Sequence, residues 1–142
     1  MRTKRREYQG DHIMVTFELK RCVHAAECLR RLPSVFDLKG RPWIQVDGAS
    51  AEEIASTIES CPSGALQYQR LDGGEAEMPD PVSSVIPIGN GPLYVRGDLS
   101  IRLEDGDILR ESRAALCRCG QSQNKPFCDN SHRKIHFSAE GA

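Results

Sequence analysis

The amino-acid sequence predicts an α+β fold, in which a small α+β module is followed by a β-rich module. Apolar and polar side chains alternate over residues 13–19, a period of two that is typical of a half-buried strand. A helix-start signature stands at residues 50–53. The dipeptides Asn90-Gly91 and Asp105-Gly106 are strong hairpin signals, and they indicate short strands in the second half.

The first half contains the elements of the α+β module. Residues 1–11 are polar and charged and are predicted to form a flexible tail, and the strand at 13–19 follows. Ser50 and Glu53 form a capping box, in which the hydroxyl meets the Glu53 amide and the carboxylate reaches back, so a helix is expected to about residue 59. Residues 43–46 carry a weak strand signal, and residues 65–71 are expected to return as a strand beside the first.

The second half begins after a segment without apolar periodicity. Residues 72–81 are rich in glycine, proline and acids and are predicted to be a linker. Alternating apolar residues at 99–103 lead into the Asp105-Gly106 turn. We therefore divide the chain into a tail at 1–11, a first module at 12–71, a linker at 72–81 and a second module at 82–142.

The composition limits the functions that the chain can have. With 142 residues, 19 basic and 20 acidic side chains and a net charge of −1, there is no case for nucleic-acid or membrane binding. Aromatic residues make up 6% of the chain, and a domain of roughly 60 residues buries only about 60% of its unfolded surface, so metal or disulfide staples are expected. The basic N-terminus lacks a following apolar run, so no signal peptide is expected. In the reducing cytoplasm that we infer, clustered cysteines indicate metal or redox chemistry.

Four potential metal ligands lie close together near the C-terminus. Cys117, Cys119, Cys128 and His132 follow the spacing C-x-C-x8-C-x3-H. Thiolate and imidazole suit iron–sulfur or zinc better than calcium or magnesium, and spacing alone leaves iron–sulfur and a structural zinc site about equally favoured. Turn formers stand between and beside them, which predicts a loop: Gly120, Asn124, Pro126, Asp129 and Asn130.

This stretch resembles the CDGSH iron–sulfur (mitoNEET-like) domain. Beyond the four ligands, the family pattern is met at Ser122, Pro126, Asp129 and Ser131. Asn130 stands where the family has glycine, and asparagine enters the left-handed region at modest cost. The resemblance implies a [2Fe-2S] cluster on three thiolates and His132, in a β-rich domain that often forms a homodimer. The cofactor-binding residues that it implies are Ser122, Lys125, Pro126, Asp129, Asn130 and Ser131.

A second set of cysteines lies in the first module. Bacterial-type ferredoxins hold a cluster with C-x2-C-x2-C and a remote cysteine that precedes proline. Overlaying that pattern places Cys22 and Cys28 at the first and third positions, Cys61 at the remote one and Ala25 at the second. With one ligand missing, the simplest expectation is a [3Fe-4S] cluster.

Residues 12–71 resemble the divergent single-cluster ferredoxins, including the kind that serve cytochromes P450. The Cys-Pro-Ser-Gly-Ala-Leu string at 61–66 and the strand–helix order carry this resemblance, which implies a ferredoxin-like module. His24 stands next to Ala25. A lone loop histidine is usually solvent-facing or hydrogen-bonded, but His24 could instead supply a fourth, labile ligand and make the cluster [4Fe-4S].

Basic residues predominate around the C-terminal ligands: Arg113, Arg118, Lys125, Arg133 and Lys134 stand against Asp129. Three interpretations stay open. The charge offsets an anionic cluster, it forms a docking face for an acidic partner, or it is only a solvated surface.

The sequence as a whole favours one-electron transfer by a two-cluster protein that works with a redox partner such as a reductase, an oxidase or a P450-like enzyme. No enzyme activity is expected, because there is no glycine-rich nucleotide loop and no nucleophile with an evident base partner. A second hypothesis is that the His-ligated cluster is donated to an apo-acceptor protein or senses pH and redox state. A third is a zinc-stabilised interaction module.

Overall fold

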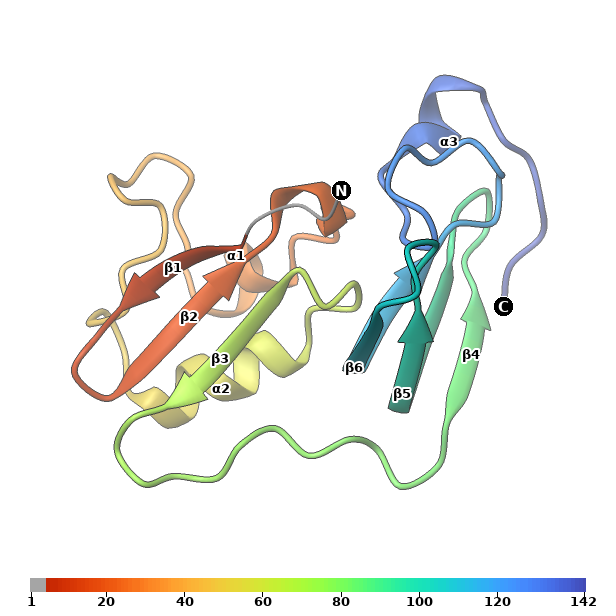
Figure 1. Ribbon diagram of the computed structural model, residues 1–142. Coiled ribbons are helices and arrows are strands. Elements are labelled where there is room, and N and C mark those ends of the chain that lie inside the picture. Colours follow the sequence, from red (N-terminus) through yellow and green to blue (C-terminus); the bar gives the residue numbers. More distant parts are fainter. Residues whose placement is uncertain (1–4) are drawn as a thin grey trace.

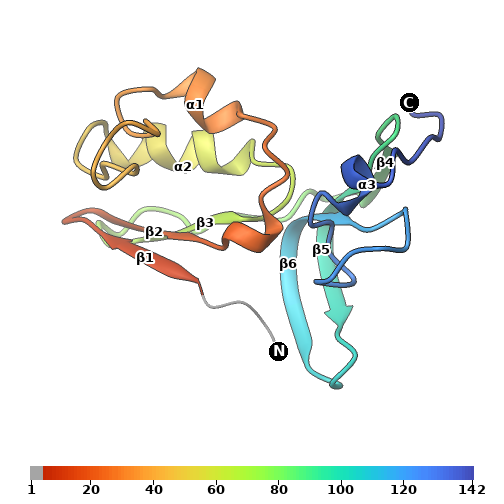
Figure 2. The ribbon, with the colours of Figure 1, turned by 90° about the horizontal axis from the view of Figure 1, so that it is seen from above.

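The computed structural model describes residues 5–142. It contains two three-stranded antiparallel sheets, which lie side by side (Figure 1). Helices pack against the first sheet, whereas the second carries only one short helix near its ligand loop (Figure 2). The predicted α+β class, with a β-rich second half, is confirmed.

The first sheet has the order β1-β2-β3, with β1 at Arg6–Gln9, β2 at Ile13–Phe17 and β3 at Leu66–Arg70. The predicted pairing of β2 with β3 is confirmed. The prediction of a flexible tail is wrong for residues 6–9, because these form β1. Residues 1–4 lie outside the part of the chain that the structure describes. Tyr8 explains the difference: it is buried opposite Val15, so one aromatic side chain anchors an otherwise polar strand.

Two helices lie over one face of this sheet (Figure 2): α1 at Glu27–Arg31 and α2 at Ala51–Glu59. A short 3-10 helix, η1 at Leu19–Arg21, follows β2. The predicted helix start is confirmed. The Ser50 hydroxyl accepts a hydrogen bond from the Glu53 amide at 3.1 Å and donates to the Glu53 carboxylate at 3.2 Å.

The core of the first module lies between its sheet and its helices. Its buried residues are Tyr8, Ile13, Val15, Leu32, Val35, Phe36, Ile44, Ile54, Ala55, Ile58 and Leu66. The weak strand signal at 43–46 corresponds to a single bridge between Ile44 and Phe36. Ile44 is buried in the core, so the apolar residue that suggested a strand is there for packing, and no longer strand forms around it.

The second sheet has the order β4-β5-β6, with β4 at Ser84–Pro87, β5 at Leu93–Arg102 and β6 at Ile108–Leu116. Both predicted hairpin turns are confirmed, and both contain residues at positive φ: Asn90 at 56° and Gly106 at 92°. Residues 117–130 form a loop after β6.

The ligand loop ends in one helical turn, α3 at Ser131–Lys134, which contains His132. Residues 72–81 connect the two sheets without helix or strand and run alongside both of them (Figure 1). Within residues 5–142, no helix is long and apolar enough to cross a membrane.

Candidate metal centres

The four C-terminal candidate ligands lie in two close pairs. The Sγ atoms of Cys117 and Cys119 are 3.9 Å apart, and Cys128 Sγ is 3.5 Å from His132 Nδ1. Among residues 5–142, no three histidine, cysteine or acidic side chains converge closely enough to hold a single ion. We call the four candidate ligands Cys117, Cys119, Cys128 and His132 the second site.

Main-chain pairing brings the two halves of the second site together. Phe127 forms a bridge with Leu116, the last residue of β6. The Cys117 amide donates to the Pro126 carbonyl at 2.8 Å, and the Cys128 amide donates to the Ala115 carbonyl at 2.8 Å. Residues 126–128 therefore pair with the end of β6, which places Cys128 opposite Ala115, two positions before Cys117.

The residues that were expected to bind the cofactor mainly shape this loop. The buried Ser122 hydroxyl donates to the Phe127 carbonyl at 2.6 Å and accepts from the Asn124 amide at 3.0 Å. The Asp129 carboxylate accepts from the amides of Gln123 and Ser131, at 2.8 and 3.0 Å. The Pro126 carbonyl holds Cys117, as described above.

Two further residues of that set are Lys125, inside the loop, and Asn130, at its end. Lys125 is exposed and lines an open groove between the two modules. Asn130 adopts the left-handed conformation that the family's glycine position led us to expect, with φ of 73°.

The loop provides N–H donors to its thiolates. The amides of Gly120, Gln121 and Asn130 donate to the sulfurs of Cys117, Cys119 and Cys128, at 3.3, 3.5 and 3.4 Å. Burial acts to raise the pKa of Cys117, but the surrounding amides of Ser122 and Gly120 outweigh it and lower that pKa. Burial raises the pKa of Cys128.

The surroundings of His132, the candidate nitrogen donor of the second site, favour its neutral form. Burial, assisted by the charge of Arg133, lowers the pKa of His132. A neutral imidazole is the form that binds metal, so the environment of His132 favours ligation.

The three cysteines of the first module also meet. Cys22 follows η1, Cys28 lies in α1 and Cys61 follows α2, and all three line one small pocket. His24 and Ala25 line the same pocket, and His24 Nδ1 lies 3.8 Å from Cys22 Sγ. We call this group the first site.

The chemistry of this pocket suits a positively charged metal centre. Burial, followed by the neighbouring Cys61 and Cys22, raises the pKa of Cys28 to about 11, and burial also raises the pKa of Cys22. The thiols of Cys22 and Cys28 therefore resist ionisation in the absence of a cation, whereas a bound iron centre reverses this preference and deprotonates its ligands. The donor set therefore fits iron.

The loop between Cys22 and Cys28 has an unusual backbone. His24 and Ala26 adopt positive φ angles of 57° and 63°. Left-handed conformations cost non-glycine residues about 1–2 kcal/mol each, and such strain concentrates at functional sites. The conformation of this loop is therefore imposed by the packing around the pocket and not by the backbone preferences of its own residues.

Sequence reasoning missed Arg21 as a residue that organises both sites. Arg21 is only 2% exposed, it follows β2 directly before Cys22, and it forms an ion pair with Glu111 of β6. It donates to the Ser63 carbonyl at 3.0 Å, and its guanidinium lies 4.1 Å from the centroid of the Phe127 ring. The sequence shows Arg21 only as part of a Lys-Arg pair, with no signal of burial.

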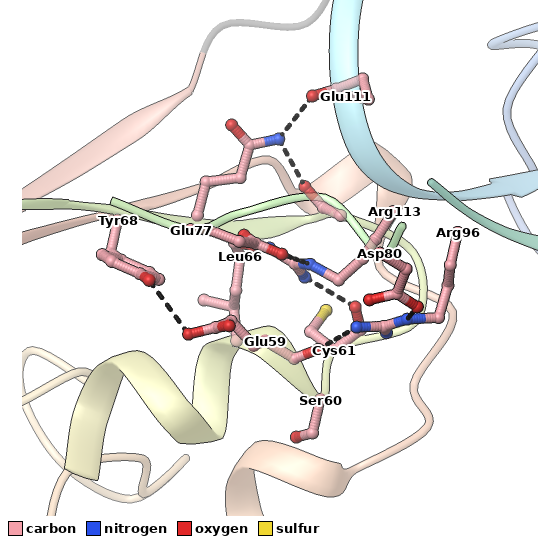
Figure 3. A network of polar contacts seen from close by, with 12 residues as sticks. Glu59, Ser60, Cys61, Leu66, Tyr68, Glu77, Asp80, Arg96, Glu111 and Arg113 are labelled. Carbon is pink, nitrogen blue, oxygen red and sulfur yellow. Dashed lines mark hydrogen bonds and ion pairs between the residues drawn. The ribbon is translucent and has the colours of Figure 1, made fainter. Parts of the chain in front are cut away.

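Arg113 is 2% exposed, so neither the docking-face nor the solvated-surface interpretation applies to it. It donates to the carbonyls of Cys61 and Leu66, at 2.6 and 2.9 Å, and to both oxygens of Glu77, at 2.8 and 2.9 Å (Figure 3). As with Arg21, the amino-acid sequence carries no signal of this burial. Arg118 is likewise occupied, because it donates to the carbonyls of Ile88, Gly91 and Glu140.

The two sites lie next to each other. Val23, beside Cys22, is buried in a small cluster with Ala115 and Cys128, and Ala25 and Tyr94 pack against it. Burial raises the pKa of Tyr94, and the thiolates of Cys128 and then Cys61 add to this effect, so one phenol senses ligands of both sites.

Comparison with known proteins agrees with this division. Residues 8–71 match the family described as a divergent 4Fe-4S mono-cluster, and residues 90–133 match the iron-binding zinc finger of CDGSH type. Two relatives from Escherichia coli, strains K12 and O157:H7, both named uncharacterized protein YjdI, are each 39% identical over 62 residues. The match covers 44% of this chain and 82% of each relative. The chain is an iron–sulfur protein that belongs to the divergent 4Fe-4S mono-cluster family and carries a CDGSH-type iron-binding domain fused behind it.

Proposed function

We propose that this protein is a one-electron carrier with two iron–sulfur clusters. The first site would hold a [3Fe-4S] cluster on Cys22, Cys28 and Cys61, and the second would hold a [2Fe-2S] cluster on its three cysteines and His132. Such clusters supply reversible one-electron redox chemistry when bound. The observation that carries the proposal is the contact between the two ligand sets through Val23 and Cys128.

The paired ligands favour a two-iron cluster over a single zinc at the second site. One zinc would gather all four donors around a point, with sulfur–sulfur distances of about 3.8 Å throughout. Here Cys117 lies close to Cys119, and Cys128 lies close to His132. Two ligands for each of two irons fit this arrangement.

The position of His24 favours a second candidate for the first site. Because His24 lines the pocket beside Cys22, it is suitably placed to supply a fourth ligand, and the cluster would then be [4Fe-4S]. The description of the matching family names a four-iron cluster.

The test is EPR with iron and sulfide analysis of anaerobically purified protein. We expect about five irons per chain and an oxidised [3Fe-4S] signal. That signal should disappear in Cys61→Ser while the [2Fe-2S] spectrum persists. About six irons, with a three-iron signal appearing in His24→Ala, would establish the second candidate. About two irons and no response to Cys61→Ser would overturn the first site.

The partner is proposed to be a redox protein such as a reductase, an oxidase or a P450-like enzyme. The alternative is donation of the His-ligated cluster to an apo-acceptor protein, and it is supported by His132 lining an open pocket that protons can reach. Incubation with an apo-ferredoxin separates the two functions. Transfer of iron and sulfide without redox coupling to a reductase would favour donation.

A further inference from the structure

Asn130 contacts a ligand residue of each site. Its side-chain Nδ2 donates to the carbonyl of Cys22 at 2.9 Å, and its main-chain N–H donates to Cys128 Sγ at 3.4 Å. Cys22 and Cys128 are 106 positions apart in the chain, so this is a tertiary connection between the two ligand loops. A glycine at this position would keep the main-chain bond and lose the side-chain bond.

The neighbouring contacts make the same connection. Arg133, directly after His132, donates to the carbonyl of Val23 at 3.3 Å. Val23 itself is only 6% exposed and packs against Cys128. Two consecutive carbonyls of the first loop are therefore held by residues that flank His132, and displacement of Cys22 must disturb the loop of the second site.

We propose that Asn130 is a positioning residue that couples the two sites, so that loading of the first site slows the loss of the cluster from the second. The inference rests on the proposed presence of both clusters. Its physical basis is that a ligated Cys22 has a fixed carbonyl, which in turn fixes the Asn130 side chain and the amide that Asn130 directs at Cys128. An unligated Cys22 leaves that acceptor free to move.

A double-mutant cycle on the full-length holoprotein tests the coupling. The first site is emptied with Cys61→Ser, which changes a ligand that Asn130 does not contact, and Asn130→Gly removes the side-chain link. Glycine adopts a φ of 73° without steric cost, so the loop of the second site should still form. The rate of loss of the [2Fe-2S] absorbance and the midpoint potential of that cluster are measured in all four proteins.

In the wild-type background we expect Cys61→Ser to accelerate cluster loss from the second site about two- to tenfold, the factor that one hydrogen bond of ordinary net strength represents. It should also shift the midpoint potential of the [2Fe-2S] cluster. In the Asn130→Gly background the acceleration should be smaller, because only the Arg133 and Val23 contacts then connect the two loops. The shift in potential should persist in part, because the charge of the first cluster is lost in both backgrounds. Cys28→Ser should reproduce the result from another ligand of the first site.

Asn90→Gly is the matched control. Asn90 also has a positive φ, and its side chain also bonds to the main chain, where it accepts from the Ala139 amide at 3.0 Å. The acceleration by Cys61→Ser should persist in this background. Equal acceleration with and without Asn130, or no acceleration in either, would overturn the coupling. Iron contents of about five in the wild type and about two in Cys61→Ser identify the two clusters independently of these rates.

Discussion

His132 illustrates how the surroundings of one residue set its chemistry. It is the candidate nitrogen donor of the second site, and burial together with Arg133 lowers its pKa from the ordinary value of 6.5. The neutral, ligating form therefore persists to lower pH than in a free histidine. As the pH falls through the lowered pKa, protons compete with iron for the imidazole.

We predict that loss of the [2Fe-2S] cluster is slow at neutral pH and accelerates below about pH 6. His132→Cys should flatten this dependence and lower the reduction potential, because a thiolate adds negative charge to the cluster. The measurement is the decay of visible absorbance across pH, together with a redox titration. His136→Ala, on the neighbouring turn, should behave like the wild type. Equal decay rates at acidic pH for wild type and His132→Cys would exclude His132 as the labile ligand.

A second prediction at this scale concerns Ala25, which lines the first-site pocket at the position of the missing ligand. Ala25→Cys should admit a fourth iron, so that the oxidised [3Fe-4S] EPR signal is lost and a reducible [4Fe-4S] signal is gained. Ala26→Ser, a change of similar size at the next position, should leave the signal as it is. A wild-type protein whose first site already holds a [4Fe-4S] cluster would contradict this prediction and identify His24 as the first ligand to mutate.

The candidate ligands of the second site could be predicted because their spacing is local in sequence and matches a recognisable pattern. Cys61 could be predicted although it is remote from Cys28, because the proline after it matches the ferredoxin pattern. Arg21 and Arg113 could not, because each is an ordinary surface residue type whose burial depends on the contact between the modules. Their environments consist largely of main-chain carbonyls, such as those of Ser63 and Leu66. Every residue has a main-chain carbonyl, so the amino-acid sequence does not show which carbonyls accept these bonds.

At the level of elements, prediction succeeded where the signal was short in range. The Ser50 cap, the alternation in β2 and the Asp105-Gly106 turn all lie within a few residues, and each element is present. The strand β1 was missed because Tyr8 alone provides its apolar contact. The need for glycine at position 64 could not be predicted either, because it comes from two arginines that are distant in the sequence.

The third prediction compares two glycines at positive φ. A Cβ at Gly64 would lie 2.4 Å from the Arg113 carbonyl oxygen and 2.6 Å from Arg21 Nη2, whereas at Gly106 nothing lies within 4 Å. Gly106→Ala should cost about 1 kcal/mol for its backbone conformation alone. Gly64→Ala should cost about 1–3 kcal/mol more, because the packed interface must shift. Urea unfolding of both variants checks this, and equal destabilisation would contradict a close approach at Gly64.

At the level of the whole molecule, a buried ion pair and buried hydrogen bonds join the two modules. Arg21 from the first module pairs with Glu111 of the second, and Arg113 of β6 reaches back to the carbonyls of Cys61 and Leu66. The connecting segment takes part, because Glu77 pairs with Arg113 and Asp80 pairs with Arg96 (Figure 3). The segment at 72–81 therefore holds the modules together in addition to linking them.

The last prediction tests this role of the connecting segment. The Arg113 side chain is 1% exposed and that of Glu77 is 15% exposed, whereas the surface pair Arg110–Asp98 is 69% and 66% exposed. Removing one partner of a buried pair leaves an uncompensated charge, so Glu77→Gln should lower the free energy of unfolding by about 3–5 kcal/mol. Asp98→Asn should change it by about 0.5 kcal/mol, as exposed pairs do.

Two probes distinguish loss of the interface from general destabilisation. Trp43 is the single tryptophan of the chain and packs in the first module, so its fluorescence reports unfolding there. Visible absorbance of the [2Fe-2S] cluster reports the second module. In the wild type the two urea transitions should coincide, as expected for one cooperative unit. In Glu77→Gln both should move to lower urea and separate, because Arg113 no longer fixes β6 against Cys61. A Glu77→Gln midpoint equal to that of Asp98→Asn would mean that the connecting segment does not hold the modules together.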